Sequence, residues 1–173
     1  MTDKKNMFKV TEAHIQAVLM RWVMEVKHHD SFIPNSNQFF TWEADLLSVT
    51  SSGLIHEFEI KTSIQDYRRD AKKRKHYKMD VSLYSPAYFW YVTFGFEIEP
   101  PENAGWIFIE YKKSDNGKDD GWNLNVKKEA PRRNEMKIDE NKRRQLNRLL
   151  SWRLYHVYAR QYLIERNAEK VLQ

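Results

Sequence analysis

Residues 43–63 read EADLLSVTSSGLIHEFEIKTS and combine two strand-like segments with the tripeptide Ser51-Ser52-Gly53. The flanking segments are rich in β-branched and other apolar residues, which favour strands, whereas serine and glycine favour turns. A three-residue loop often has glycine in its last position, where the backbone is left-handed. We therefore expect a hairpin whose loop is centred on Ser52 and whose register sets Asp45 opposite Glu59.

Charged and apolar residues alternate along the second of these segments. Because successive side chains of a strand point to opposite faces, Glu57, Glu59 and Lys61 share one face. Phe58 and Ile60 share the other face, which we expect to contact the core.

The expected register opposes charged side chains across the hairpin. Asp45 lies opposite Glu59 and Glu43 opposite Lys61, with Cβ atoms about 4.5–5.5 Å apart in each pair. Two carboxylates at that distance repel one another unless a cation lies between them, and a divalent ion such as Mg²⁺ takes such oxygen ligands. Lys61 can then orient or deprotonate an attacking water and stabilise the transition state. The alternative is a solvated hairpin face, with Glu43 and Lys61 as an ordinary ion pair.

Composition predicts a folded protein with a single domain spanning residues 1–173. Hydrophobic residues make up 41% of the chain, which excludes a disordered class, and the lack of cysteine excludes disulfides and zinc–thiolate sites. There is no phosphate-binding glycine loop and no nucleophile elbow. The first residues have no apolar signal-peptide core and no run of about 18 apolar residues occurs, so we expect no membrane span and a cytoplasmic location.

Positive charge is clustered, although the net charge is only +5. Clusters of lysine and arginine interleaved with aromatic residues are typical of proteins that bind a phosphate backbone. The alternative is that they form the solvated faces of two helices. The first cluster contains Arg68, Arg69, Lys72, Lys73, Arg74, Lys75 and Lys78, and the second contains Arg132, Arg133, Lys137, Lys142, Arg143, Arg144 and Arg148.

The remaining pattern predicts an α/β protein with helices packed against a sheet. Apolar residues at helical spacing predict a helix over 11–26 with Thr11 as N-cap, followed by a polar connection over 27–37. A charged helix capped by Ser63 is expected over 63–78, and a long helix, or two in sequence, from residue 138. Strands are expected at 38–49, 54–61, 88–94, 106–111 and 122–126, with 88–94 in the centre of the sheet.

The sequence Ala44-Asp45, followed after the turn by Glu59-Ile60-Lys61, resembles the signature of PD-(D/E)XK nucleases. The longer stretch Glu59–Lys73, followed by Tyr77 and by the aromatic strand from Tyr88, resembles MmcB-like DNA-repair and phage-borne members, which carry a Glu-x-Lys-x-Ser, Asp-aromatic, Asp-x-Lys progression. The resemblance covers residues 11 to about 111. Ala44 replaces the proline of the family name, which removes no ligand.

This resemblance implies a restriction-endonuclease-like αβββαβ core over about 11–111, with a mixed sheet flanked by helices. A β and long C-terminal helical extension then covers 112–173. It also implies Mg²⁺- or Mn²⁺-dependent hydrolysis of DNA in DNA repair or phage DNA processing, inside a bacterial or phage-infected cell. A non-catalytic DNA-binding or repair-accessory module on the same fold is the alternative, and RNA as substrate stays open.

The resemblance also implies roles for individual residues. Asp45, Glu59 and Lys61 are the expected catalytic residues, and Asp45, Glu59, Ile60 and Glu12 the expected metal ligands. Glu12 has the alternative role of a first-turn acid that favours the helix dipole. Ser63, Asp66, Asp70, Lys72 and Tyr77 can line the site or serve as caps and solvated residues. The expected DNA-binding residues are Arg68, Arg69, Lys72, Lys73, Arg74 and Lys75.

Overall fold

A computed structural model of the chain describes residues 10–37, 39–70, 85–112 and 121–171. The chain divides into two compact units, Met1–Lys137 and Ile138–Gln173. The expected single domain, with a core up to about residue 111, stays a prediction. Within the described ranges, no helix combines the length and the apolar composition needed to cross a bilayer.

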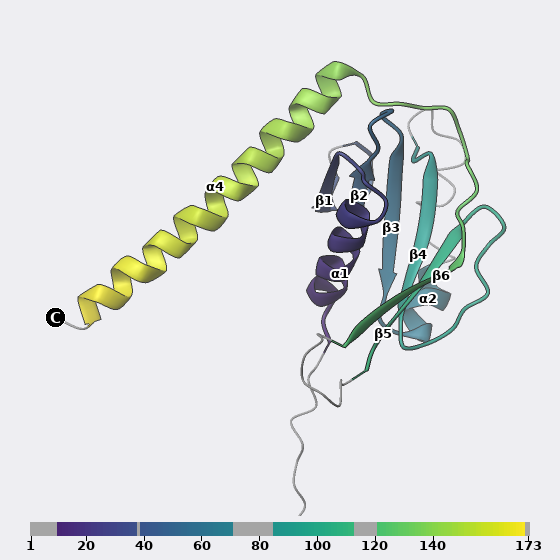
Figure 1. Cartoon of the computed structure of the whole chain (residues 1–173), viewed down its shortest axis with the longest axis horizontal. Coiled ribbons are helices and arrows are strands. Elements are labelled where there is room, and N and C mark those ends of the chain that lie inside the picture. Colours follow the sequence, from purple (N-terminus) through teal and green to yellow (C-terminus); the bar gives the residue numbers. More distant parts are fainter. Residues whose placement is uncertain (1–9, 38, 71–84, 113–120, 172–173) are drawn as a thin grey trace, which may run out of the picture. The chain divides into compact units, whose positions relative to one another are not determined.

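The first unit contains a six-stranded mixed sheet with helices on its faces (Figure 1). The strands lie in chain order, from β1 to β6. Neighbouring strands are antiparallel except for β3–β4 and β4–β5, which are parallel. The predicted α/β class is therefore confirmed. The elements are α1 (Glu12–Glu25), β1 (Ser31–Ser36), β2 (Ala44–Val49), β3 (Ile55–Lys61), α2 (Ile64–Asp70), β4 (Tyr88–Phe94), β5 (Gly105–Tyr111) and β6 (Trp122–Lys128).

The hairpin of β2 and β3 has the predicted register. Leu46 pairs with Phe58 and Val49 pairs with Ile55. Gly53 closes the loop with φ +86°, in the left-handed region that glycine adopts without steric cost. The three-residue loop is therefore confirmed, and with it the face on which each side chain of the hairpin lies.

Two boundaries near this hairpin were predicted wrongly. Residues 27–37 are not a simple connection, because β1 forms within them and pairs with β2. Pro34 is tolerated there since β1 is an edge strand, where a missing N–H costs no ladder hydrogen bond on the open side. The strand expected from residue 38 begins only at Ala44. Instead of pairing, Phe40 and Trp42 stack on each other with ring centroids 4.8 Å apart.

One face of the sheet carries the larger apolar core. α1 places Ile15, Leu19 and Val23 there, all fully buried, while Val26 at its C-cap is exposed. Thr11 is the N-cap, as predicted, and its N–H donates to His14 Nδ1 at 3.0 Å. The sheet contributes Leu46, Phe58, Ile60, Trp90, Val92, Ile107 and Ile109.

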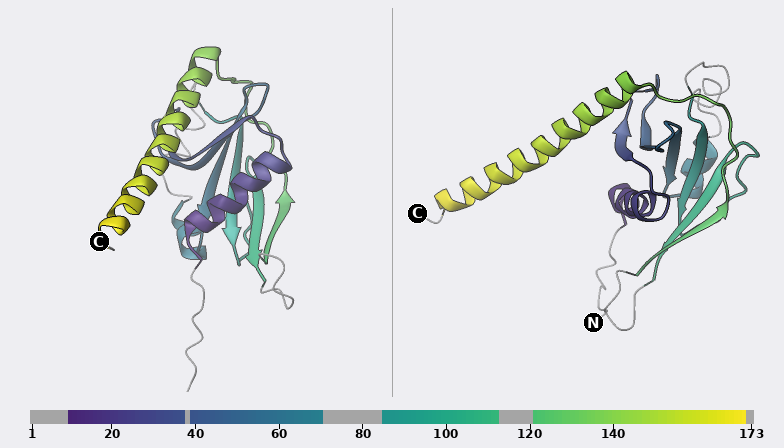
Figure 2. Two further views of the ribbon diagram at one scale, coloured as in Figure 1. Left: turned by 60° about the vertical axis from the view of Figure 1, so that its left-hand side comes forward. Right: turned by 45° about the horizontal axis from the view of Figure 1, so that its top comes forward.

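The other face is covered in part by α2. Ile64 and Tyr67 of this helix pack against Phe89 and Tyr91 of β4, so α1 and α2 lie on opposite faces of the sheet (Figure 2). Ser63 Oγ accepts a hydrogen bond from the Asp66 N–H at 3.2 Å, which confirms the predicted helix cap. The helix was expected to reach residue 78, but residues 71–84 lie outside the described part. β4 is an interior strand, as predicted.

The second unit is one helix, α4 (Glu140–Val171). Asp139 precedes it, and its Oδ1 accepts a hydrogen bond from the Lys142 N–H at 2.7 Å, as an N-cap does. Of the two alternatives for this region, the single long helix is the one observed.

Two histidines, the buried His56 and the half-buried His29, lie side by side in the first unit. His56 Nδ1 accepts a hydrogen bond from Trp90 Nε1 at 3.1 Å, and His29 Nδ1 lies 2.7 Å from Ser48 Oγ. The two imidazole rings are 4.5 Å apart. Burial lowers the pKa of His29 to about 4 and that of His56 to about 3, and each ring is further disfavoured as a cation by neighbouring positive charge.

We expect the protein to lose stability when the pH falls from 7 to 5. The unfolded chain takes up protons on both histidines below their ordinary pKa of about 6.5, whereas the folded chain stays neutral there until about 4 for His29 and about 3 for His56. Each histidine then lowers the free energy of unfolding by at most about 1.4 kcal/mol for each pH unit of the decrease. Urea denaturation at both pH values measures this loss. The His29→Asn/His56→Gln variant, which cannot titrate at these positions, should lose much less, and an equal loss would contradict the explanation.

Candidate active site

Lys61, the last residue of β3, has a buried ammonium group that contacts several carboxylates. Its side chain is 2% exposed, and Nζ lies 2.6 Å from Glu59 Oε1 and 3.0 Å from Asp70 Oδ1. Asp66 Oδ2 is 3.5 Å away and partly exposed. Because a buried charge without partners costs several kcal/mol, these contacts determine the position of the ammonium group.

The same contacts determine the protonation state of Lys61. Burial by itself lowers the pKa of Lys61, but the charge and hydrogen bond of Glu59, followed by those of Asp70, outweigh it and raise the pKa above its ordinary value. A lysine in this state is a cation and not a base. Of the two roles expected for Lys61, the raised pKa suits orienting a water and not deprotonating one.

Tyr91 of β4 extends this network to the neighbouring strand. Its hydroxyl donates to Asp70 Oδ2 at 3.0 Å, and its backbone is paired with Glu59 in the parallel ladder. Burial, followed by the charge of Asp70, raises the pKa of Tyr91, so the hydroxyl keeps its proton and stays a donor. Tyr91, Asp70, Lys61 and Glu59 therefore form one buried network that joins β4, α2 and β3.

The face of β3 that carries Lys61 is buried and not solvated. Glu57 is fully buried, and both of its carboxylate oxygens accept from Trp42 Nε1 at 3.1 Å. Glu43, the expected partner of Lys61 in the solvated alternative, is an exposed residue, while Lys61 contacts Glu59 and Asp70. The interpretation of this face as an ordinary wet surface is therefore wrong.

Backbone groups of β3 face β2 where the hairpin ladder ends. The Thr50 N–H donates to Leu54 O at 3.0 Å, so these residues form a hydrogen-bonded pair. Hydrogen-bonded pairs alternate with non-hydrogen-bonded pairs along an antiparallel ladder. Every second residue of β3, counted from Leu54 to Ile60, therefore directs its N–H and its C=O toward β2. Leu46 and Phe58 are the last paired residues, so Ile60 lies two residues beyond the end of the ladder.

Asp45 lies at this end of the ladder. Its Oδ2 accepts the Ile60 N–H at 2.7 Å, in place of a backbone carbonyl. The register puts Asp45 on the face of Glu59, as predicted, and the carbonyl of Ile60 points to the same region as its N–H. The Asp45 carboxylate is thereby held at the backbone of Ile60, the neighbour of Glu59 in β3.

α1 brings Glu12 to the same region through Gln16. The Gln16 amide nitrogen lies 2.9 Å from the Asp45 carbonyl oxygen, 3.2 Å from Glu12 Oε1 and 2.8 Å from Asn35 Oδ1. Burial, followed by the negative charge of Glu59, raises the pKa of Glu12. Gln16 was not predicted as part of the site, although a polar residue beside Ile15 on the apolar stripe, one turn after Glu12, was a usable signal.

The carboxylates of Asp45 and Glu59 and the carbonyl of Ile60 are oxygen ligands of the kind that a magnesium-like ion prefers. In the part of the chain that the structure describes, no three Asp, Glu, His or Cys side chains are grouped as a metal site. Mg²⁺ commonly uses one or two protein carboxylates and completes its shell with waters and substrate oxygens. Asp45, Glu59 and the Ile60 carbonyl match that requirement, with Glu12 as a further acid nearby.

The expected DNA-binding residues are described only in part. Arg68 and Arg69 are exposed on α2, the helix that contributes Asp66 and Asp70 to the contacts of Lys61, and Arg69 lies 3.8 Å from Asp66. This places two cations at the border of the network. The other residues of that group lie outside the described part: Lys72, Lys73, Arg74 and Lys75.

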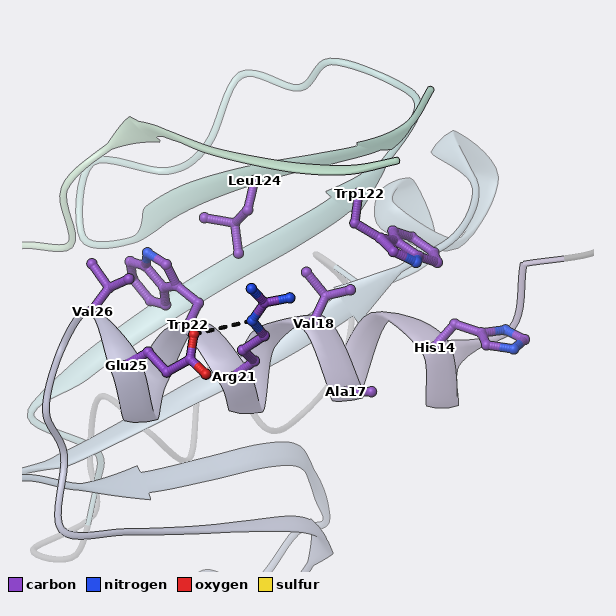
Figure 3. Close-up of a pocket in the computed structure, with 9 residues that line it drawn as sticks. All are labelled: His14, Ala17, Val18, Arg21, Trp22, Glu25, Val26, Trp122 and Leu124. Atoms are coloured by element: carbon purple, nitrogen blue, oxygen red, sulfur yellow. Dashed lines mark hydrogen bonds and ion pairs between the residues drawn. The ribbon is translucent and has the colours of Figure 1, made fainter. Parts of the chain in front are cut away.

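An apolar groove lies on the opposite side of the sheet, between α1 and β6 (Figure 3). It has a volume of about 450 Å³ and is lined by Val18, Trp22, Trp122 and Leu124, among others. The Arg21–Glu25 ion pair, at 3.0 Å, lies along it. None of the residues of the Lys61 network lines this groove, so the two features are separate.

Comparison with known proteins assigns no activity. No protein-family model matches the sequence, and no curated protein does. Among solved structures, SPO1766, a protein of unknown function from Silicibacter pomeroyi, is similar over 76% of this chain and 79% of its own, with 16% identity and a TM-score of 0.49. A similarity at this level carries no functional argument, so the function must be argued from the site.

Replacing Lys61 by alanine should lower the free energy of unfolding by about 3–5 kcal/mol, because Glu59 and Asp70 would stay buried without the ammonium that both contact. Urea denaturation at pH 7 measures the change. Lys112→Ala is a matched control, since Lys112 contacts Glu110 at 2.7 Å but is 72% exposed. Its loss should stay below about 1 kcal/mol. Equal losses in the two variants would contradict the importance of the buried network.

Proposed function

We propose that this chain is a metal-dependent nuclease of the PD-(D/E)XK class. The observation that carries the proposal is the position of the Lys61 ammonium, 2.6 Å from Glu59, beside the ladder end where Asp45 and Ile60 meet. A restriction-endonuclease-like core is part of the proposal. Its support is the element order α1, β1, β2, β3, α2, β4, which reads αβββαβ.

In the proposed site, Asp45, Glu59 and the Ile60 carbonyl would hold Mg²⁺ or Mn²⁺, with Glu12 as a further ligand directly or through water. When bound, such an ion lowers the pKa of a coordinated water and neutralises charge on a phosphodiester oxygen. Lys61 orients the attacking water and stabilises the negative charge that develops on the phosphate. Asp70 and Tyr91 hold Lys61 in place.

The proposed substrate is DNA, and the proposed contact surface is the basic cluster that begins on α2. Arg68 and Arg69 border the network on this helix. Lys72, Lys73, Arg74 and Lys75 follow in the sequence. Guanidinium and ammonium groups beside a hydrolytic site can hold the phosphate backbone while the reacting phosphate enters. A role in DNA repair or phage DNA processing rests on the sequence resemblance.

Purified protein should cleave DNA with Mg²⁺ or Mn²⁺ and lose all cleavage in EDTA, because the proposed ligands act only through a hard cation. Asp45→Asn and Glu59→Gln should each lose at least about 100-fold in rate and also weaken Mn²⁺ binding, measured by calorimetry. Lys61→Met should lose a similar factor in rate but keep Mn²⁺ binding.

Glu57→Gln is the matched control for these variants, because it neutralises a buried carboxylate on the same face of β3 that Trp42 already holds. It should cleave within a few-fold of the wild-type rate, and circular dichroism checks that each variant is folded. Cleavage undiminished by EDTA would refute the metal mechanism. DNA binding without cleavage under any metal would instead support a non-catalytic accessory module on the same fold.

Neutralising Arg68, Arg69, Lys72 and Lys73 to glutamine should weaken DNA binding and flatten its salt dependence. Each lost phosphate contact reduces the slope of log K against log salt by about 0.9. Fluorescence anisotropy with labelled duplex at several salt concentrations measures the slope. A control with four scattered cations neutralised, Arg21, Lys27, Lys112 and Lys127, removes the same charge and should keep most of the slope. Equal slopes in the two variants would show that α2 is a solvated face.

A further inference from the structure

Exposed apolar side chains gather on α4. Among the described residues, eight of the eleven exposed large hydrophobic side chains lie between residues 152 and 164 of this helix, each 52–65% exposed. Three, Met24, Val26 and Tyr111, belong to the first unit. The eight are Trp152, Leu154, Tyr155, Val157, Tyr158, Tyr162, Leu163 and Ile164.

Trp152, Tyr155 and His156 contact one another along the helix, but the described part of the second unit has no other element that could cover these side chains. Apart from its flanking residues it consists of α4 alone, 32 residues long. Single helices gain most of their stability in proteins from packing one face against another element, and a helix that is apolar on several sides is normally covered. A cluster of exposed apolar side chains commonly marks an interaction site.

The spacing on α4 suits a second helix of the same kind. Leu150, Leu154, Val157, Gln161 and Ile164 follow one another at intervals of four, three, four and three residues. This is the spacing of the seam in a two-stranded coiled coil, where side chains of one helix fit between those of its partner. A polar residue within such a seam, here Gln161, favours a defined register and number of strands.

The exposed area is sufficient for a dimer. Four of the eight are aromatic side chains, which present about 150–250 Å² each, and four are smaller aliphatic ones, so at more than half exposure they leave on the order of 800 Å² per chain open. Two copies together therefore expose on the order of 1,600 Å², of which roughly 1,000 Å² must be buried to form a specific interface. A second copy provides a matching apolar surface by symmetry, whereas the described part of the first unit exposes just three large apolar side chains.

We infer that α4 is a dimerisation helix, which pairs along the seam of Leu150, Leu154, Val157, Gln161 and Ile164 with α4 of a second copy. This inference does not depend on the proposed nuclease activity. It gives the second unit a function of its own, which is to join two first units into one two-fold particle.

Light scattering on the full chain tests the inference. At about 10 µM, which exceeds the Kd of about 1 µM expected for a modest interface, the mass should be twice the 20.9 kDa of one chain. The seam variant Leu154→Lys/Val157→Lys should have the mass of one chain. The control variant Gln145→Lys/His156→Lys, which adds the same number of lysines to the same helix away from the seam, should stay dimeric.

Near-UV circular dichroism, to which the buried Trp90 contributes, reports whether the aromatic side chains keep their fixed packing in each variant. A wild-type mass of one chain at up to about 100 µM, far above that Kd, would overturn the inference and indicate that α4 is covered within its own chain. A dimer that survives the seam substitutions would also overturn it, since another surface would then hold the copies together. A wild-type mass above two chains would exclude the two-fold pair.

Discussion

Lys61 carries its ammonium group into the interior of the first unit, where an ion without partners would cost several kcal/mol. Its partners come from separate elements: Glu59 from β3 itself and Asp70 from the last turn of α2. Asp70 is in turn bound by Tyr91 of β4. The ion pair can form only when α2 follows β3 closely and returns over the sheet. This buried charge therefore acts together with the packing of Ile64 and Tyr67 to hold α2 against the sheet.

The place of the candidate site follows from where the hairpin ladder stops. Along a paired ladder, backbone groups are used by the neighbouring strand, and side-chain carboxylates have no access to them. Where the paired residues end, at Leu46 and Phe58, Asp45 turns its carboxylate to the Ile60 N–H. At the end of the ladder, the Asp45 carboxylate can thus reach the backbone of β3 next to Glu59 and Lys61. Gln16 connects α1 to the same place through the Asp45 carbonyl.

Sequence reasoning predicted what depends on local chemistry and missed what depends on distant contacts. The loop at Gly53 and the alternation along β3 are local, and they were sufficient for the register that puts Asp45 and Glu59 on one face. β1 was missed because a proline among polar residues is also typical of a connection, and only pairing with β2 makes it a strand. The burial of Lys61 could not be read from alternation, since an alternating strand predicts one solvated face. That face is covered by α2 and Trp42, which contact Lys61 and Glu57 from elsewhere in the sequence.

The different side chains on the two faces of β3 also disfavour any other register of the hairpin. Phe58 and Ile60 lie in the apolar core with α1, while Glu57, Glu59 and Lys61 lie on the other side. A slip of one residue would exchange the faces throughout the strand. Lys61 would then enter a core of isoleucine, leucine and tryptophan side chains, and Ile60 would face Asp70, so both faces would be penalised at once. In an uncharged strand of the same length, such a slip would not bury a charge in the apolar core, so that part of the free-energy cost would be missing. Glu59 and Lys61, which we propose for catalysis, therefore also help to specify the β2–β3 register that positions them. This contribution to specificity is a reason to keep a buried ionic network even though the apolar core supplies most of the stability.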